Sequence, residues 1–209
     1  MALGNLQETI VVVSGSFDNV KTVDIRFLQE ASRFGHLHVL LYSDKTIVAL
    51  SGIAPKFPEA ERQYFLESIR FVNKVSMVPE MPNLNAIPKL YKLQINASSK
   101  IIWAVKEQDE DTRKNKFCNE NHIEYQVIPE NDLEGYPLEF QKPILPTSKK
   151  KVVVTGSFDW MHSGHVRFFE EAADLGELFV IVGHDANIKL LKGEGHPLFN
   201  QVERQYMVQ

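Results

Sequence analysis

The chain has 209 residues, of which 44% are hydrophobic, 24% charged and 10% aromatic, so it can bury a core and is not disordered as a whole. Its 23 basic and 27 acidic side chains give a net charge of −4, which offers no overall positive field, and we expect no nucleic-acid partner. No apolar run approaches the ~20 residues that span a bilayer, no signal pattern precedes Thr9, and the single cysteine, Cys118, allows no internal disulfide, so we expect a cytoplasmic protein without a membrane span.

Buried strands alternate with helical patterns along the first 130 residues. Continuous apolar runs bounded by turn residues predict strands at Ile10 to Ser14, Leu37 to Tyr42, Lys74 to Val78, Ile101 to Val105 and Ile123 to Ile128. Such runs are typical of strands that are covered on both faces, as in a parallel sheet, and Trp103 is predicted to be core. The alternation predicts an α/β fold with a doubly wound parallel sheet, in which ligands bind at the carboxyl ends of the strands.

The segment from Pro129 to Lys150 has the composition of a linker. It holds four of the ten prolines and ends in the run Ser148-Lys-Lys-Lys151, whose charges we interpret as solvated linker lysines. It separates a predicted domain at 1–130 from a second domain at 151–209, with 131–150 as the linker.

The chain repeats itself at an offset of 141 residues. Val11 to Asp18 (VVVSGSFD) aligns with Val152 to Asp159 (VVVTGSFD), and Glu61-Arg-Gln-Tyr64 recurs, after one inserted residue, as Glu203-Arg-Gln-Tyr206. We therefore predict two tandem copies of one domain. The second copy stops inside a predicted helix, and we expect it to be incomplete and the sequence to be a fragment of a longer protein.

The residues that suggest chemistry follow the first strand of the second copy. His162 and His165 share one face of the first turn of a helix that runs to a stop at Gly176, beside the free backbone N–H groups that bind phosphates. Gly156 and Gly164 let the backbone approach a ligand. This arrangement favours phosphoryl or nucleotidyl transfer, because that chemistry needs mainly positioning and stabilisation of charge. The glycine spacing disfavours both a dinucleotide fingerprint and a P-loop.

The segment Gly156-Ser-Phe-Asp-Trp-Met-His-Ser-Gly-His165 resembles the signature G-x-F-D-x-x-H-x-G-H of the HxGH nucleotidyltransferase superfamily, in its cytidylyltransferase-like group. The resemblance covers the second copy and, in degenerate form, the first. It implies a Rossmann-like nucleotidyltransferase fold and attack by a phosphorylated small molecule on the α-phosphorus of CTP or ATP. Pyrophosphate is then released, with Mg²⁺ as the assisting cofactor.

The resemblance also assigns roles by motif position. His162 and His165 would hold the triphosphate and stabilise the transition state, and Lys192 would neutralise phosphate charge, which makes these three the candidate catalytic residues. Arg204 would reach the triphosphate from the next helix, Lys189 would add a second cation, and Asp159 would shape the turn or touch the acceptor. The candidate nucleotide-binding residues are Gly156, Ser157, Phe158, Asp159, Gly164, Lys189 and Arg204, and no protein metal site is assigned.

The first copy departs from this signature. Lys21 and Asp24 replace the two histidines and Val23 replaces the glycine between them, so we predict that this copy does not catalyse the reaction. Residues 1–150 could instead form an inactive nucleotide-binding, regulatory or dimerisation module, within a homodimer or an internal pseudo-dimer.

Other interpretations stay open from the sequence alone. The two histidines could be capping or surface residues, or a metal pair completed by His184 or His196. Arg204 recurs as Arg62 in the first copy, so an ion pair on the helix would explain both arginines. Aminoacyl-tRNA synthetases use a similar histidine signature, but their lysine-rich loop is not visible here. The acceptor and the choice between CTP and ATP are not specified, with a preference for CTP from the Gly-x-Phe-Asp form.

Overall fold

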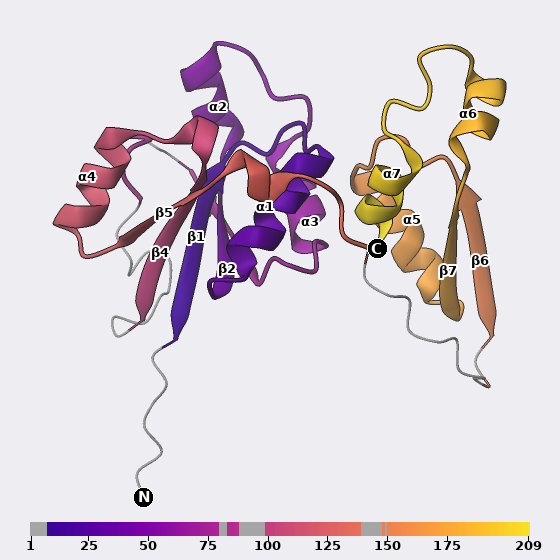
Figure 1. The fold of residues 1–209 in the computed structure, drawn as a ribbon, viewed down its shortest axis with the longest axis horizontal. Helices are drawn as coiled ribbons and strands as arrows, with labels where there is room; N and C mark the ends of the chain where they lie inside the picture. The colour runs from indigo at the N-terminus through magenta and orange to yellow at the C-terminus, as the bar shows by residue number, and fades with distance from the viewer. Residues whose placement is uncertain (1–7, 80–82, 88–98, 139–147, 149) are drawn as a thin grey trace, which may run out of the picture. The chain divides into compact units, whose positions relative to one another are not determined.

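A computed structural model describes residues 8–79, 83–87, 99–138, 148 and 150–209. The chain divides into two compact units, Met1–Glu134 and Gly135–Gln209, which we call unit 1 and unit 2 (Figure 1). Most of the predicted linker, at 139–147 and 149, lies outside the described residues. The predicted linker begins inside a short helix, η3 (Glu130–Leu133). This helix contacts α1 of unit 1, and its Leu133 is buried.

Unit 1 contains a five-stranded parallel sheet in the order β3-β2-β1-β4-β5. The strands are β1 (Thr9–Gly15), β2 (His36–Tyr42), β3 (Lys74–Val78), β4 (Lys100–Lys106) and β5 (Glu124–Ile128). Each of the five predicted strands is present, and the order, with β1 beside both β2 and β4, is that of a doubly wound sheet. The predicted fold class is therefore confirmed, and a ligand crevice is expected above the carboxyl ends of β1 and β4.

Unit 1 has four α-helices among its described residues, and two of them begin at polar side-chain caps. The four are α1 (Thr22–Ser32), α2 (Asp44–Ser51), α3 (Glu59–Glu67) and α4 (Thr112–Glu120), with a short helix η2 (Glu107–Asp109) after β4. Ser43 caps α2 by accepting from the Thr46 N–H, and Asp111 caps α4 by accepting from the Arg113 N–H. These bonds satisfy backbone donors that the first turn of a helix leaves open.

Both faces of the unit 1 sheet are covered. Val12, Leu40 and Trp103 form one cluster with Cys118 of α4, and all four are fully buried. Val11 and Val13 point to the opposite face and are 0% and 1% exposed, and α1 contacts β1 and β2. The prediction that Trp103 is core is confirmed, and burial raises the pKa of the Cys118 thiol to about 11, which leaves it protonated and unreactive.

Unit 2 repeats the beginning of unit 1. Its two strands, β6 (Lys151–Gly156) and β7 (Glu177–Val182), pair in parallel with Gly156 opposite Val182, as Gly15 lies opposite Leu41 in β1 and β2. Three helices accompany them: α5 (Ser163–Ala173), α6 (Asp185–Lys192) and α7 (Gln201–Val208). Asn200 and Glu203 form a capping box at the start of α7.

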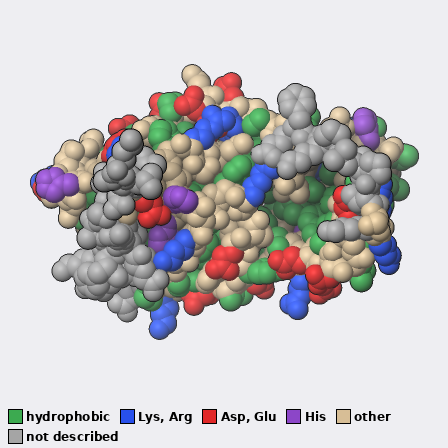
Figure 2. All heavy atoms as spheres, turned by 90° about the horizontal axis from the view of Figure 1, so that it is seen from below, with side chains coloured by type: hydrophobic (Ala, Val, Ile, Leu, Met, Phe, Trp, Pro, Cys, Tyr) green, Lys and Arg blue, Asp and Glu red, His purple; other side chains and the backbone are tan. Residues whose placement is uncertain are grey.

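One face of the β6–β7 pair is exposed in unit 2. Val153 and Ile181 are 59% and 55% exposed, whereas the equivalent Val12 and Leu40 of unit 1 are 0% exposed. In unit 1 these positions lie in the cluster that β4 and α4 complete, and no corresponding strand pairs with β6 among the described residues of unit 2. On the face of the molecule that Figure 2 shows, acidic and basic side chains are interspersed. No helix in the described part of the chain has the length and apolarity needed to cross a membrane.

Candidate functional site

The loop after β6 has an unusual backbone that is shared by both units. Phe158 has a φ of 47° and Phe17 has a φ of 45°, a region that side-chain-bearing residues rarely adopt. In each unit the phenylalanine ring folds back over the preceding glycine: a Cβ on Gly156 would meet the Phe158 ring at 2.8 Å, and one on Gly15 would meet the Phe17 ring at 3.1 Å. The glycine of the Gly-Ser-Phe-Asp motif therefore makes room for the phenylalanine.

Asp159 fastens this loop to the segment that precedes α7. Its Oδ1 accepts hydrogen bonds from the backbone N–H groups of Leu198 at 2.6 Å and Phe199 at 3.1 Å, and its Oδ2 lies 3.0 Å from Nδ1 of His196. Burial acts to raise the pKa of Asp159, but the Leu198 N–H, His196 and Phe199 N–H outweigh it and leave the pKa lowered. Asp18 of unit 1 likewise accepts from the N–H groups of Lys56 and Phe57.

Arg204 is buried behind the loop, with its side chain 1% exposed. Its guanidinium donates to the carbonyls of Phe199, Ser157 and Gly183 and to the carboxylate of Asp185. Arg62 makes the matching bonds in unit 1, to the carbonyls of Phe57, Ser16 and Tyr42 and to Asp44. In this structure Arg204 holds the loop in place, so a direct contact with a triphosphate would require some of these bonds to break.

The two histidines stand at the beginning of α5. His162 is the N-cap, and its Nδ1 accepts a hydrogen bond from the Gly164 N–H at 3.1 Å. A Cβ on Gly164 would meet the His162 ring at 2.9 Å, which explains the glycine between the histidines. The rings of His162 and His165 have their centroids 4.2 Å apart, and the Phe158 and His165 rings form a T-shaped contact at 5.6 Å.

The surroundings of His165 favour its neutral form. Burial, followed by the charges of His162 and Lys192, lowers its pKa below the usual value of 6.5. Its Nδ1 is buried and has no hydrogen-bond partner within the described residues. A half-buried imidazole with an unsatisfied nitrogen, beside the N–H groups of a helix N-terminus, is suited to contact an anionic ligand.

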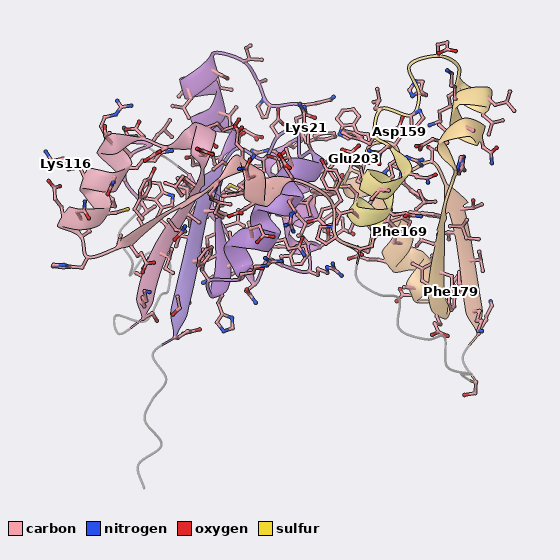
Figure 3. The ribbon with its side chains drawn as sticks, viewed as in Figure 1. Lys21, Lys116, Asp159, Phe169, Phe179 and Glu203 are labelled. Atoms are coloured by element: carbon pink, nitrogen blue, oxygen red, sulfur yellow. The ribbon has the colours of Figure 1, made fainter. Side chains whose placement is uncertain are left out.

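Lys192 reaches the same place from the end of α6. Its Nζ donates to Ser157 Oγ at 2.9 Å. Lys192 and Ser157 thus meet near the two histidines, close enough for the charge of Lys192 to act on His165. Asp159 lies at the carboxyl end of the strands of unit 2 (Figure 3). Lys189, by contrast, forms an exposed ion pair with Glu194 at 3.1 Å.

The corresponding place in unit 1 is occupied by an ion pair. Asp24 stands where His165 stands in unit 2, and its carboxylate bonds to Nζ of Lys106 at the end of β4 and accepts from the Lys21 N–H at 2.7 Å. Lys21 itself lies at the carboxyl end of the sheet (Figure 3). A carboxylate of the chain therefore takes the position that an anionic ligand would need.

The histidines considered as partners for a metal pair are engaged elsewhere. His184 caps α6 through a bond from the Ala186 N–H to its Nδ1, and His196 bonds to Asp159. Within the described ranges no three His, Cys, Asp or Glu side chains are grouped so that they could hold a metal ion. Sequence reasoning considered His196 only as a metal ligand and missed its bond to Asp159. The two residues are 37 positions apart, so local spacing gave no signal for this bond.

Comparisons with known proteins agree with the signature in unit 2. The family model described as cytidylyltransferase-like matches residues 153–209. The bifunctional protein HldE of Campylobacter concisus is 43% identical over 68 residues, which are 32% of this chain and 14% of that protein. The protein of the same name from Shewanella sp. strain ANA-3 is 42% identical over 83 residues, 39% of this chain and 16% of its own. The chain thus matches about one sixth of the length of these relatives.

Solved structures show weaker likeness. The lipopolysaccharide core biosynthesis protein from Thermoplasma volcanium has a TM-score of 0.44 and 22% identity, and the match covers 58% of this chain and 94% of that one. NadR, solved in complex with NAD and AMP-PNP, has a TM-score of 0.36 and 18% identity, with 59% of this chain and 39% of that chain covered. The likeness to the cytidylyltransferase-like family lies in the sequence match of residues 153–209.

Proposed function

We propose, from the premise that residues 153–209 carry the sequence of the cytidylyltransferase-like nucleotidyltransferases, that unit 2 contributes to nucleotidyl transfer. The substrate pair is a nucleoside triphosphate, CTP or ATP, and a phosphorylated small molecule. The observation that carries the proposal is the meeting of His162, His165 and Lys192 at the N-terminus of α5.

The reaction needs no general base from the chain. An anionic oxygen of the acceptor's phosphate attacks the α-phosphorus and forms a new P–O bond, while the bond from the α-phosphorus to the bridging oxygen breaks and pyrophosphate leaves. Charge accumulates on the phosphate oxygens in the transition state, and positioned donors lower its energy. A cluster of imidazole, ammonium and backbone N–H groups supplies such donors.

The hydrogen bonds of the site define where protons are held. Because Nδ1 of His162 accepts from the Gly164 N–H, a neutral His162 carries its proton on Nε2, and this N–H can donate to a phosphate oxygen. Lys192 would exchange its bond with Ser157 Oγ for a phosphate contact. Gly156, Phe158 and Asp159 shape the loop, Gly164 makes room for His162, and Lys189 would require release from Glu194 before it binds phosphate.

Mg²⁺ belongs to this proposal as a companion of the triphosphate. The carboxylate of Asp159 is already used by Leu198, Phe199 and His196, and no metal-holding group of three side chains is found in the described part of the chain. Mg²⁺ commonly keeps several waters and binds substrate phosphates. Among the described residues, the side chains present do not form a protein-based site for it.

Titration calorimetry on the full chain with CTP and with ATP, each with Mg²⁺, tests the proposal. We compare the parent with His165→Ala and with His165→Asp, which introduces the residue of unit 1. Loss of one donor should weaken triphosphate binding roughly tenfold, and the carboxylate about a hundredfold, because it adds repulsion to the lost bond. A pyrophosphate-release assay with phosphorylated alcohols and sugars then tests turnover. Equal affinity of the parent and His165→Asp would refute the assigned site.

For unit 1 we propose a module without catalytic activity, with a regulatory or dimerisation role. The ion pair of Asp24 with Lys106 fills the ligand position, while Asp18 and Arg62 keep the loop intact. If unit 1 binds no nucleotide, the His165→Asp chain should show only the roughly hundredfold weaker triphosphate binding of unit 2. Sedimentation of the full chain over a range of concentrations tests self-association, and a second, tighter binding event in that variant would contradict the proposal for unit 1.

A further inference from the structure

Two side-chain bonds connect the segment after α6 to the signature loop of unit 2. Lys192 Nζ donates to Ser157 Oγ at 2.9 Å, and His196 Nδ1 lies 3.0 Å from Asp159 Oδ2. The two donors are four residues apart in the segment 192–196, and the two acceptors are two residues apart in the loop. The segment is therefore attached to the loop at two points, and one of them bears the candidate catalytic amine.

Unit 1 provides an internal control for these two bonds. Ser51 and Ala54 stand at the equivalent positions, and Ser51 Oγ instead lies within hydrogen-bond distance of two carbonyls of unit 1, those of Ile47 at 2.9 Å and Ile53 at 3.1 Å. Asp18 uses both carboxylate oxygens for backbone N–H groups, one each for Phe57 and Lys56. In unit 2 both backbone N–H groups share Oδ1 of Asp159, which leaves Oδ2 to His196.

The two side-chain bonds are thus found in the same unit as the two histidines. The unit that has His162 and His165 also has Lys192 and His196, and the unit that lacks the histidines has residues that form neither bond. The bonds to backbone N–H groups and the buried arginine, by comparison, are present in both units. A contact needed only for folding would be expected in both.

We infer that His196 is a positioning residue for the proposed transfer reaction: through Asp159 it holds the turn that follows α6, so that Lys192 stays at the signature loop. The inference rests on the proposed function, because that function gives Lys192 its role in binding phosphate. It assigns His196 no contact with substrate. The backbone of this turn needs such a restraint, because Gly193 and Gly195 have φ values of 90° and 86° and glycine is conformationally permissive.

A double-mutant cycle on the full chain tests whether His196 acts through Lys192. Triphosphate affinity is measured for the parent, His196→Ala, Lys192→Ala and the double variant. We expect His196→Ala to weaken binding about tenfold in the parent but to have no further effect when Lys192 is already absent, since contacting residues of one network are not additive. His196→Asn, whose amide can donate to Asp159 in place of Nδ1, should restore most of the affinity.

A matched control separates positioning from general loss of structure. His184→Ala removes the N-cap of α6, the same helix that ends at Lys192, and any effect it has should be the same in both backgrounds. The inference is overturned if His196→Ala has no effect, or if its effect is equally large with and without Lys192.

A second measurement needs no nucleotide. An amine-reactive reagent labels exposed lysines, and mass spectrometry gives the rate at each site. Lys192 should react several-fold faster in His196→Ala than in the parent or His196→Asn, whereas Lys100 of unit 1, which pairs with Glu124 at 2.6 Å, should not change. If the parent binds no triphosphate, the proposed function fails, and this rate alone decides the inference. An unchanged Lys192 rate would refute it.

Discussion

The loops that follow β1 and β6 are supported by the same contacts in the two units, but different residues begin the helix after each loop. The glycine under a phenylalanine of positive φ, the aspartate on two backbone N–H groups and the buried arginine recur at matching positions. What changes is the start of the following helix, where unit 2 has His162 and His165 and unit 1 has Lys21 and Asp24. Comparing the two units therefore distinguishes the residues that build the loop, which recur, from the residues at the start of the following helix, which differ.

Backbone strain by itself does not distinguish the unit with the two histidines from the unit without them. A positive φ at a residue other than glycine is often read as a sign of function. Phe17 has nearly the same φ as Phe158, yet it lies in the unit whose ligand position holds Asp24 and Lys106. The strained phenylalanine is therefore part of the loop structure that both units share. The strain is compatible with two histidines at the start of the following helix, as in unit 2, and with an ion pair there, as in unit 1.

The largest effect that we expect concerns the paired arginines. Arg62→Met and Arg204→Met each remove a buried guanidinium and leave several carbonyls without their donor, so each should lower the free energy of unfolding of its own unit by about 4 kcal/mol. The two tryptophans lie in different units, Trp103 in unit 1 and Trp160 in unit 2, so fluorescence during urea unfolding reports on each.

A different result for the two arginines would alter the comparison. If Arg204→Met left the unfolding of unit 2 unchanged and weakened only triphosphate binding, Arg204 would act on the ligand, as its motif position suggests. The contacts that support the loop would then differ between the two units at this residue.

The second effect is a pH dependence that belongs to unit 1. Burial, and then the charge of Lys74, lowers the pKa of His38 to about 4, and its Nε2 lies 2.8 Å from Ser76 Oγ. As pH falls below about 6.5, the unfolded chain takes up the proton first, so unit 1 should lose about 3 kcal/mol of stability by pH 4.

Phe179 stands at the equivalent position of unit 2, on β7 (Figure 3). The exchange His38→Phe should therefore remove this part of the pH dependence. Unfolding is followed through Trp103, in a Trp160→Phe background, between pH 7 and pH 4. An unchanged slope in the His38→Phe chain would show that other groups cause the loss.

The smallest effect concerns the two loop glycines. Gly156→Ala places a Cβ 2.8 Å from the Phe158 ring, whereas Gly15→Ala places one 3.1 Å from the Phe17 ring. We expect a loss of about 1 to 2 kcal/mol in unit 2 and less in unit 1, since the closer contact forces a shift. Phe158 packs on His165, so Gly156→Ala should also weaken triphosphate binding. Calorimetry and unfolding on the same samples check both expectations, and equal losses in the two units would argue against this difference.

Much of the fold was predictable because apolar runs and repeats are local in the sequence. The five strands of unit 1, the burial of Trp103 and the repeat at 141 residues follow from such patterns, and the comparisons confirm the cytidylyltransferase-like resemblance for 153–209. The placement of Arg204 was less accessible, because a motif does not show which carbonyls surround a side chain. Its recurrence as Arg62 was the available signal for a structural role.

The roles within the site depend on contacts across the fold. The bond of His196 to Asp159 joins residues 37 positions apart and forms only when the turn after α6 meets the loop after β6. The ion pair of Asp24 with Lys106 joins residues 82 positions apart, and the sequence showed only that a carboxylate had replaced a histidine. Such bonds follow from the tertiary arrangement of the strands and not from the residues on either side.

We expect the exposed face of the β6–β7 pair to affect how the chain behaves at high concentration. Val153 and Ile181 present an apolar strip on a sheet of which β6 pairs only with β7 among the described residues. Unpaired strand edges beside apolar strips recruit further strands from other molecules. We therefore expect precipitation in concentrated samples to begin at unit 2, and a lysine at position 153 to delay it.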